Sequence, residues 1–309
     1  MTDKVARETV GVRKRPPLLV ELFSQLLIKK PLGTVGFFIT ILLFAVGISA
    51  DWLAPYGYNE INLPARLDAP SAAHPMGTDN LGRDLLSRII YGARISVIVG
   101  LAASVIDNVI TVLIGTVSGF LGGKVDIIMQ RFVDAFMCVP PLLMYMTIMA
   151  VLGPGLLQII LVLGIVGGIR STRVLRGAVI GIRQNAYIEA AYTIGASTWR
   201  IIIKHVLPNV MGIVIVLFTV DIGGKILAEA TLSFLGFGIP PPVPSWGGML
   251  SEAGRRYMLL APWMAFWSGL ALATMVFSIN MLGDAMRDLL DPRLRGGLGR
   301  YGGIRRKII

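Results

Sequence analysis

Four ionisable side chains lie within long apolar stretches of the sequence, where a charge is costly unless it is paired or hydrated. Asp107 stands in one stretch, and Asp221, Lys225 and Glu229 stand together in another. Because the last three are spaced i, i+4 and i+8, a helix places them on one face with a rise of about 6 Å per step. Either this face lines a hydrated path for a solute, or Lys225 is held between two carboxylates and locks helices together.

The sequence offers little for covalent or metal chemistry. It has two histidines far apart, His74 and His205, and a single cysteine, Cys138. An internal disulfide is therefore excluded, and neither a His-rich nor a Cys-based metal centre is expected. The stretch GFLGGKV at 119–125 lacks the first Gly and the final Ser or Thr of a phosphate-binding loop. We expect no metal, no cofactor and no ATP to be bound by this chain.

The composition predicts a protein that crosses a membrane several times. Of 309 residues, 54% are hydrophobic and 15% are charged, and the mean hydropathy is +0.72, which is more apolar than a soluble domain requires. A helix needs about 20 residues to cross about 30 Å of hydrocarbon. We predict an all-α polytopic membrane protein with six transmembrane helices, at about 32–52, 95–120, 136–152, 156–169, 210–231 and 262–282. Gly153-Pro154-Gly155 separates the short third and fourth spans.

The distribution of basic residues predicts the orientation of the chain in a lipid bilayer. With the N-terminus in the cytoplasm, 22 of the 29 Lys and Arg fall on the cytoplasmic side and six on the outer side, as the positive-inside rule requires. The net charge of +11 then needs no nucleic acid as partner. The predicted organisation is a cytoplasmic segment 1–31 with an amphipathic helix, a first span 32–52, a periplasmic segment 53–93, a five-helix core 94–283 and a cytoplasmic tail 284–309. The core includes a cytoplasmic loop 170–208 and a periplasmic loop 232–261.

The segment 187–209 is polar and basic, although apolar stretches flank it on both sides. An apolar face recurs at helical spacing in Ala186, Ala190, Ala191 and Ile194. Gly195 stands where such a helix ends, Ser197 suits the N-cap of a second helix, and Pro208 suits the start of the fifth span. The pattern predicts a helix–turn–helix that acts as a lever on the attached spans. An ordinary hairpin between two spans is the alternative.

The spacing of Glu189-Ala190-Ala191, Gly195 and Leu207-Pro208 resembles the EAA loop in the membrane subunits of bacterial ABC importers. In that family the loop forms a short helix that docks into a groove on a cytoplasmic ATPase. Further stretches look like the C-type permease of dipeptide, oligopeptide and nickel importers: HPMGTDNLGRDLLSRIIYGAR (74–94), DIIMQRFVDAFMCVPPLL (126–143), LAEATLSFLGFGIPPPVPSWGGML (227–250) and GDAMRDLLDPRLR (283–295). The resemblance covers about residues 20–296.

The resemblance implies the type I ABC importer permease fold, the bacterial inner membrane with both termini in the cytoplasm, and ATP-driven uptake of short peptides. The implied partners are a homologous B-type permease, two ATP-binding subunits that carry ATP and Mg, and an extracytoplasmic substrate-binding protein. The implied ATPase-coupling residues are Glu189, Ala190, Ala191, Gly195, Ala196, Ser197, Leu207 and Pro208. Nickel or another small solute is the alternative cargo. A secondary transporter that uses the intramembrane charges as an ion relay is the alternative class.

The outer segments 53–93 and 233–261 are expected to form the surface that receives the binding protein. Glu229, near the outer end of its span, is expected to shape an outer gate. Four charged residues of the first segment are expected to form an internal salt-bridged cap instead of contacting a partner: Asp79, Arg83, Asp84 and Arg88.

Overall fold

The computed structural model describes residues 18–290, without the side chains of residues 18–23, 254 and 255. The predicted basic segment before residue 18 and the tail from residue 291, with the end of the 283–295 stretch, lie outside the described residues. Within 18–290 the regular elements are helices, and one isolated β-bridge pairs Thr78 with Asp84. The prediction of an all-α protein is therefore confirmed for this part of the chain.

The α-helices are α1 (Leu18–Lys29), α2 (Pro31–Ile48), α3 (Ala50–Leu53), α4 (Leu85–Leu121), α5 (Gly123–Cys138), α6 (Pro141–Leu152), α7 (Leu156–Arg183), α8 (Ala186–Thr193), α9 (Thr198–Ile201), α10 (Leu207–Phe234), α11 (Trp246–Glu252) and α12 (Pro262–Leu290). A short 3-10 helix, η1 (Leu63–Ala65), precedes α4, and two π-helical turns, η2 (Ile202–Val206) and η3 (Ala253–Tyr257), follow α9 and α11.

Five stretches in this region are long and apolar enough to cross a membrane: α2, α4, α7, the continuous run from α9 to α10, and α12. The pair α5 and α6 makes a sixth if the two count as one span, but they are bent by 89°. The predicted third span 136–152 is therefore not one helix: it joins the end of α5 to α6, and it counts as a span only as part of the bent pair. Pro140 and Pro141 lack backbone N–H donors and disfavour the α conformation in the residue before them, so the chain turns there. With 12 residues, α6 alone is about 18 Å long and too short to cross.

Two helices, α4 and α7, extend beyond the spans predicted from hydropathy. α4 begins at Leu85, ten residues before the predicted start, because the Asp84 side chain caps the helix by accepting from the Ser87 N–H. α7 continues to Arg183 through the basic residues that follow its apolar half. The segment predicted as a cytoplasmic loop from residue 170 is thus helical over its first third. The amphipathic helix predicted near the N-terminus corresponds to α1.

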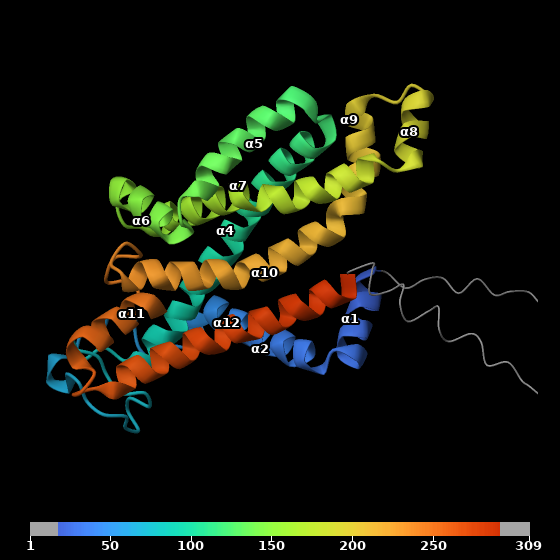
Figure 1. The fold of residues 1–309 in the computed structure, drawn as a ribbon. Helices are drawn as coiled ribbons and strands as arrows, with labels where there is room; N and C mark the ends of the chain where they lie inside the picture. Colours follow the sequence, from blue (N-terminus) through green and yellow to red (C-terminus); the bar gives the residue numbers. More distant parts are fainter. Residues whose placement is uncertain (1–17, 291–309) are drawn as a thin grey trace, which may run out of the picture.

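α4 is the centre of the bundle and contacts α2, α7, α10 and α12 (Figure 1). Its contact with α7 is close because glycines on both helices admit the facing backbone. A Cβ added at Gly119 of α4 would lie 2.9 Å from the Arg176 carbonyl oxygen, and one added at Gly168 of α7 would lie 2.7 Å from the Asp107 carbonyl oxygen. This contact fixes the position of Asp107 relative to α7.

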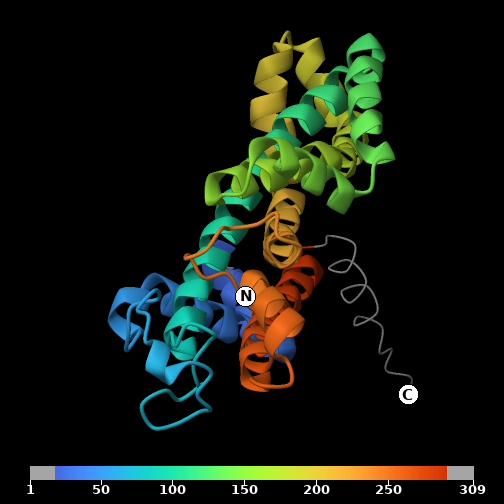
Figure 2. The same ribbon diagram turned by 90° about the vertical axis from the view of Figure 1, so that its left-hand side faces the viewer.

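The two ends of the bundle differ. Figure 1 places α1, the last turns of α12 and the α8–α9 hairpin toward one end, and α11 with the loops before α4 at the other. Figure 2 views the molecule from this second end, where the segment 54–84 and the loop around α11 lie in front. Segments predicted to be cytoplasmic thus share one end, and segments predicted to be periplasmic share the other.

Candidate functional sites

The α8–α9 hairpin is anchored to the bundle by two side chains of α8. Ile188 is 1% exposed and Ala191 is 6% exposed, in a cluster with Phe120 at the end of α4 and Val179 of α7. The two positions lie three residues apart and therefore share one face of the helix. A displacement of α8 must consequently move the ends of α4 and α7.

The turn between α8 and α9 has the hydrogen bonds of a Schellman motif. The Gly195 N–H donates to the Tyr192 carbonyl at 2.9 Å, and the Ala196 N–H donates to the Ala191 carbonyl at 3.0 Å. Gly195 has φ +79°, a conformation that glycine adopts without penalty. Ser197 then caps α9 by accepting from the Arg200 N–H at 3.4 Å. The predicted helix end at Gly195 and N-cap at Ser197 are confirmed.

The opposite face of α8 is free of the bundle. Ala186, Glu189 and Ala190 are exposed, and Ile194 at the tip of the hairpin is 83% exposed. Ala191, predicted to share this apolar face, instead packs inward with Ile188, because it lies on the other side of the helix. An apolar tip exposed beyond the bundle is typical of a contact surface for another protein.

Leu207 and Pro208 are the first two residues of α10, as predicted for Pro208 at the start of the fifth span. Helical backbone runs on from Thr198 to Phe234, and the π turn η2 stands directly before them. Pro208 removes an N–H donor and clashes with the carbonyl four residues earlier in a regular α-helix. The wider π turn relieves that conflict without ending the helix. Pro208 therefore lies at the start of α10, and η2 joins α10 to the hairpin without a break in the helical backbone.

The four intramembrane charges do not form the predicted arrangement. The Lys225 ammonium pairs with the Asp107 carboxylate on α4 at 2.5 Å, instead of lying between Asp221 and Glu229. Asp107 is 1% exposed and Lys225 is 6% exposed. Glu229 accepts a hydrogen bond from the Ser233 hydroxyl at 2.7 Å. Of the predicted ion pairs that would hold helices together, the structure has only one of this kind among these four charges, and it joins α10 to α4.

Gly167 of α7 makes room for this ion pair. A Cβ added there would lie 1.9 Å from Lys225 Nζ and 2.3 Å from Asp107 Oδ2. Thr111 Oγ1 lies 3.2 Å from Asp107 Oδ1 and 3.1 Å from the Gly168 carbonyl oxygen, so the pair is held between three helices. Sequence reasoning missed Gly167. The doubled glycine beside the basic end of α7 was the available signal.

Asp221 and Arg170 lie near the Asp107–Lys225 ion pair but are not part of it. Asp221 Oδ2 is buried without a hydrogen-bond partner among the described residues. Arg170 donates to the carbonyl oxygens of Phe136 and Val139 at 3.0 and 3.2 Å, at the corner between α5 and α6. The sequence had suggested that Arg170 is a loop residue, whereas it lies within α7.

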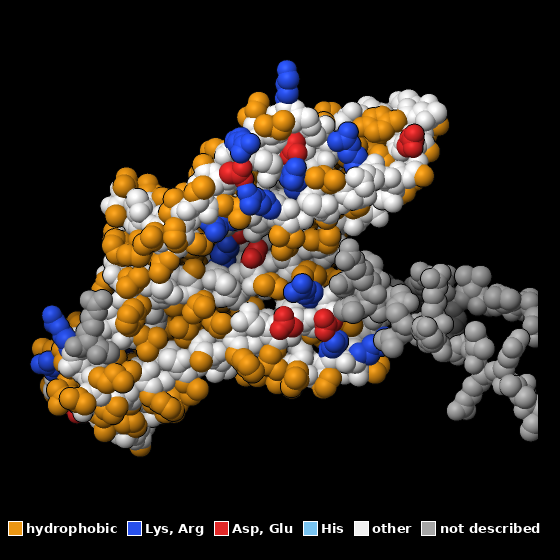
Figure 3. Space-filling view, in the orientation of Figure 1, with side chains coloured by type: hydrophobic (Ala, Val, Ile, Leu, Met, Phe, Trp, Pro, Cys, Tyr) orange, Lys and Arg blue, Asp and Glu red, His pale blue; other side chains and the backbone are white. Residues whose placement is uncertain are grey.

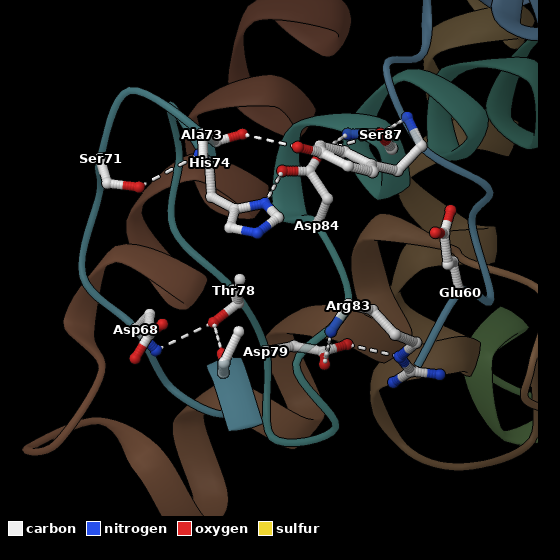
Figure 4. Close-up of polar contacts among 12 residues, drawn as sticks. Glu60, Asp68, Ser71, Ala73, His74, Thr78, Asp79, Arg83, Asp84 and Ser87 are labelled. Carbon is white, nitrogen blue, oxygen red and sulfur yellow. Dashed lines mark hydrogen bonds and ion pairs between the residues drawn. The ribbon is translucent and has the colours of Figure 1, made fainter. Parts of the chain in front are cut away.

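The end of the bundle opposite the hairpin carries a compact charged cap, shown in Figure 4. Asp79 accepts from the Arg83 guanidinium at 2.6 Å and from the Leu81 and Arg83 N–H groups, and Arg88 lies 3.4 Å away. Asp84 accepts from Ser87 and lies 2.9 Å from His74 Nδ1. These buried pairs confirm the predicted salt-bridged cap. A hollow of about 510 Å³ beside it is lined partly by Arg83, Arg88 and Glu252.

Comparison with known proteins assigns the chain to a family. Residues 111–296 match the binding-protein-dependent transport system inner membrane component, and residues 21–70 match the N-terminal TM domain of oligopeptide transport permease C. The chain belongs to this family of multi-pass inner-membrane ABC importer permeases, as its sequence had indicated.

Several curated relatives are similar over most of their length. The chain is 41% identical to the oligopeptide transport system permease protein OppC of Bacillus subtilis, over 85% of this chain and 86% of that protein. It is 39% identical to the dipeptide transport system permease protein DppC of the same organism, over 91% and 88%. It is 40% identical to the probable D,D-dipeptide transport system permease protein DdpC of Escherichia coli, over 86% and 89%.

Proposed function

We propose that this chain is the permease subunit through which an ATP-driven importer moves short peptides. The observation that carries the proposal is the exposed face of α8, with Ile194 83% exposed at the tip of a hairpin that is itself rooted in the bundle. The names of two relatives, an oligopeptide and a dipeptide transport permease, support peptides as cargo. They favour peptides over the alternative of nickel or another small solute.

The proposed partners are a homologous B-type permease, two cytoplasmic ATP-binding subunits and an extracytoplasmic binding protein. ATP and Mg are bound by the ATP-binding subunits, which hydrolyse the nucleotide. We infer that both termini of this chain are cytoplasmic, from the distribution of its basic residues. The proposed coupling segment comprises the residues assigned from the sequence: Glu189, Ala190, Ala191, Gly195, Ala196, Ser197, Leu207 and Pro208. Ala191 anchors this segment to the bundle, whereas Glu189 and Ala190 are exposed.

The geometry supports a mechanical role for the hairpin. Helical backbone continues without a break from Thr198 to Phe234, over 37 residues with a contour length of about 55 Å at 1.5 Å per residue. Figure 1 shows that it changes direction between α9 and α10. Its cytoplasmic end is joined to α8 by the Gly195 turn, and its outer end leads into the loop before α11. When the ATP-binding subunits close, they move α8, and α10 transmits this movement across the membrane. The bundle then opens outward to take peptide from the binding protein.

The alternative of a secondary transporter would use the intramembrane charges as an ion relay. The Asp107–Lys225 contact favours a structural lock instead, because both charges are buried and neutralise each other. Glu229 binds Ser233 four residues further along α10, which supports a role in holding the outer end of that helix and thereby the outer gate.

The test is to tag the chain, solubilise it gently from its own membrane and identify the proteins that co-purify. A second permease and ATP-binding subunits at matched amounts, together with ATP-dependent dipeptide uptake after reconstitution, are expected. A chain that purifies alone under mild crosslinking would contradict the proposal.

A further inference from the structure

A second hollow, of about 250 Å³, opens between α7 and α10 near the middle of the bundle. Its lining includes Tyr145, Arg170, Ser171, Asp221 and Lys225. Figure 3 shows basic and acidic side chains together in the recess between these two helices. Gly224 also lines it, and an added Cβ there would meet nothing within 4 Å. The hollow is therefore open and polar at a depth where most side chains are apolar.

Two of the charged side chains around this hollow have no oppositely charged partner among the described residues. Lys225 is neutralised by Asp107 at 2.5 Å. Asp221 and Arg170 form no ion pair with any described residue, although Arg170 donates to two carbonyl groups. The hollow thus presents one uncompensated carboxylate and one uncompensated guanidinium.

The position of Asp221 excludes contact with lipid. It lies 14 residues after Leu207 and 13 before Phe234, at the midpoint of α10. An ionised carboxylate at the bilayer centre faces the interior of a bundle or water, because exposure to hydrocarbon costs several kcal/mol. Its partner must therefore come from a hydrated path, from the solute in that path or from another subunit.

We propose that this hollow is a contact site for the peptide during translocation, in which Asp221 binds the protonated amino group and Arg170 binds a carboxylate of the same zwitterion. The proposal rests on the function proposed above. A dipolar ligand satisfies both uncompensated charges with charge-assisted hydrogen bonds, which are stronger than neutral ones. Lys225, held by Asp107, keeps α10 in register with α4 so that Asp221 faces the hollow.

The test is a thiol-protection measurement on the complete importer in nanodiscs, without the binding protein. In a Cys138→Ser background, Gly224→Cys places a thiol in the hollow. Gly212→Cys is the matched control, because it lies on the same helix, outside the hollow, and also has nothing within 4 Å of an added Cβ. The rate of N-ethylmaleimide labelling is measured with increasing dialanine or N-acetyl-dialanine.

Dialanine is expected to slow labelling at position 224 and to leave position 212 unchanged. N-acetyl-dialanine should protect at about tenfold higher concentration, because it lacks the charged amino group that Asp221 binds. Adding Asp221→Asn should weaken protection by dialanine to the level of the acetylated peptide.

Equal protection by the two peptides, or protection that survives Asp221→Asn, would overturn the proposal. So would a thiol at 224 that reacts in the isolated chain but not in the importer, since another subunit would then cover the hollow. Dipeptide uptake by the same reconstituted variants is measured in parallel with the binding protein added. Uptake without protection rejects this site alone, whereas loss of uptake by the wild-type importer rejects the proposed function.

Discussion

Gly167→Ala is expected to destabilise the bundle even though alanine favours helices. In an unobstructed helix the substitution would gain about 1 kcal/mol. At position 167 the new Cβ would lie 1.9 Å from Lys225 Nζ and 2.3 Å from Asp107 Oδ2, so both side chains must shift and their ion pair is disrupted. Breaking a buried ion pair costs about 3–5 kcal/mol. The net loss should be about 2–4 kcal/mol.

Gly177→Ala is the matched control for this change. Gly177 lies on the same helix, and an added Cβ meets nothing within 4 Å, so its substitution should be neutral or stabilising by up to about 1 kcal/mol. Thermal unfolding of the solubilised importer, followed by tryptophan fluorescence, compares the two variants. A second comparison repeats Gly167→Ala in an Asp107→Ala/Lys225→Ala background, where the methyl group has room and the penalty should vanish. Equal stability of the two single variants, or a penalty that persists without the pair, would refute the reasoning.

Ala190→Asp places a charge on the exposed face of α8. The free energy of unfolding should change by less than about 0.5 kcal/mol, whereas peptide uptake should fall at least about tenfold while ATP hydrolysis continues. Normal uptake would contradict the coupling role, and Ala190→Ser should keep it. Gly195→Val should likewise uncouple ATP hydrolysis from peptide uptake. It should also lower the free energy of unfolding by about 1–2 kcal/mol, because a residue with a side chain is strained at φ +79°. Asp84→Ala removes the cap of α4 and the contact with His74, and should cost about 1–2 kcal/mol in thermal unfolding; a similar loss from the exposed Asp68→Ala would contradict this.

The features that the sequence predicted well are set by short-range rules. The hairpin is an example: Gly195 and Ser197 end one helix and begin the next through bonds to residues within five positions. The apolar length of α2, α4 and α12 likewise indicates membrane spans without knowledge of their neighbours.

The features that the sequence missed depend on tertiary contacts. Lys225 has an acidic residue one turn away on each side, so spacing alone favoured Asp221 and Glu229 as partners. Its actual partner, Asp107, is 118 positions away and is brought close by α4. The bend between α5 and α6 was also missed, because the apolar run continues through Pro140 and hydropathy does not register a change of direction.

Site-specific crosslinking at the tip of the hairpin tests the central claim most directly. In a Cys138→Ser background, Ile194→Cys carries a thiol-linked photocrosslinker at a position that is 83% exposed, and Val151→Cys carries it on α6 at a position that is 82% exposed. The account predicts that position 194 forms an adduct with an ATP-binding subunit, with a yield that changes when ATP is added, and that position 151 does not. An absent adduct at 194, or an equal adduct at both positions, would contradict the claim that α8 receives force from the ATP-binding subunits.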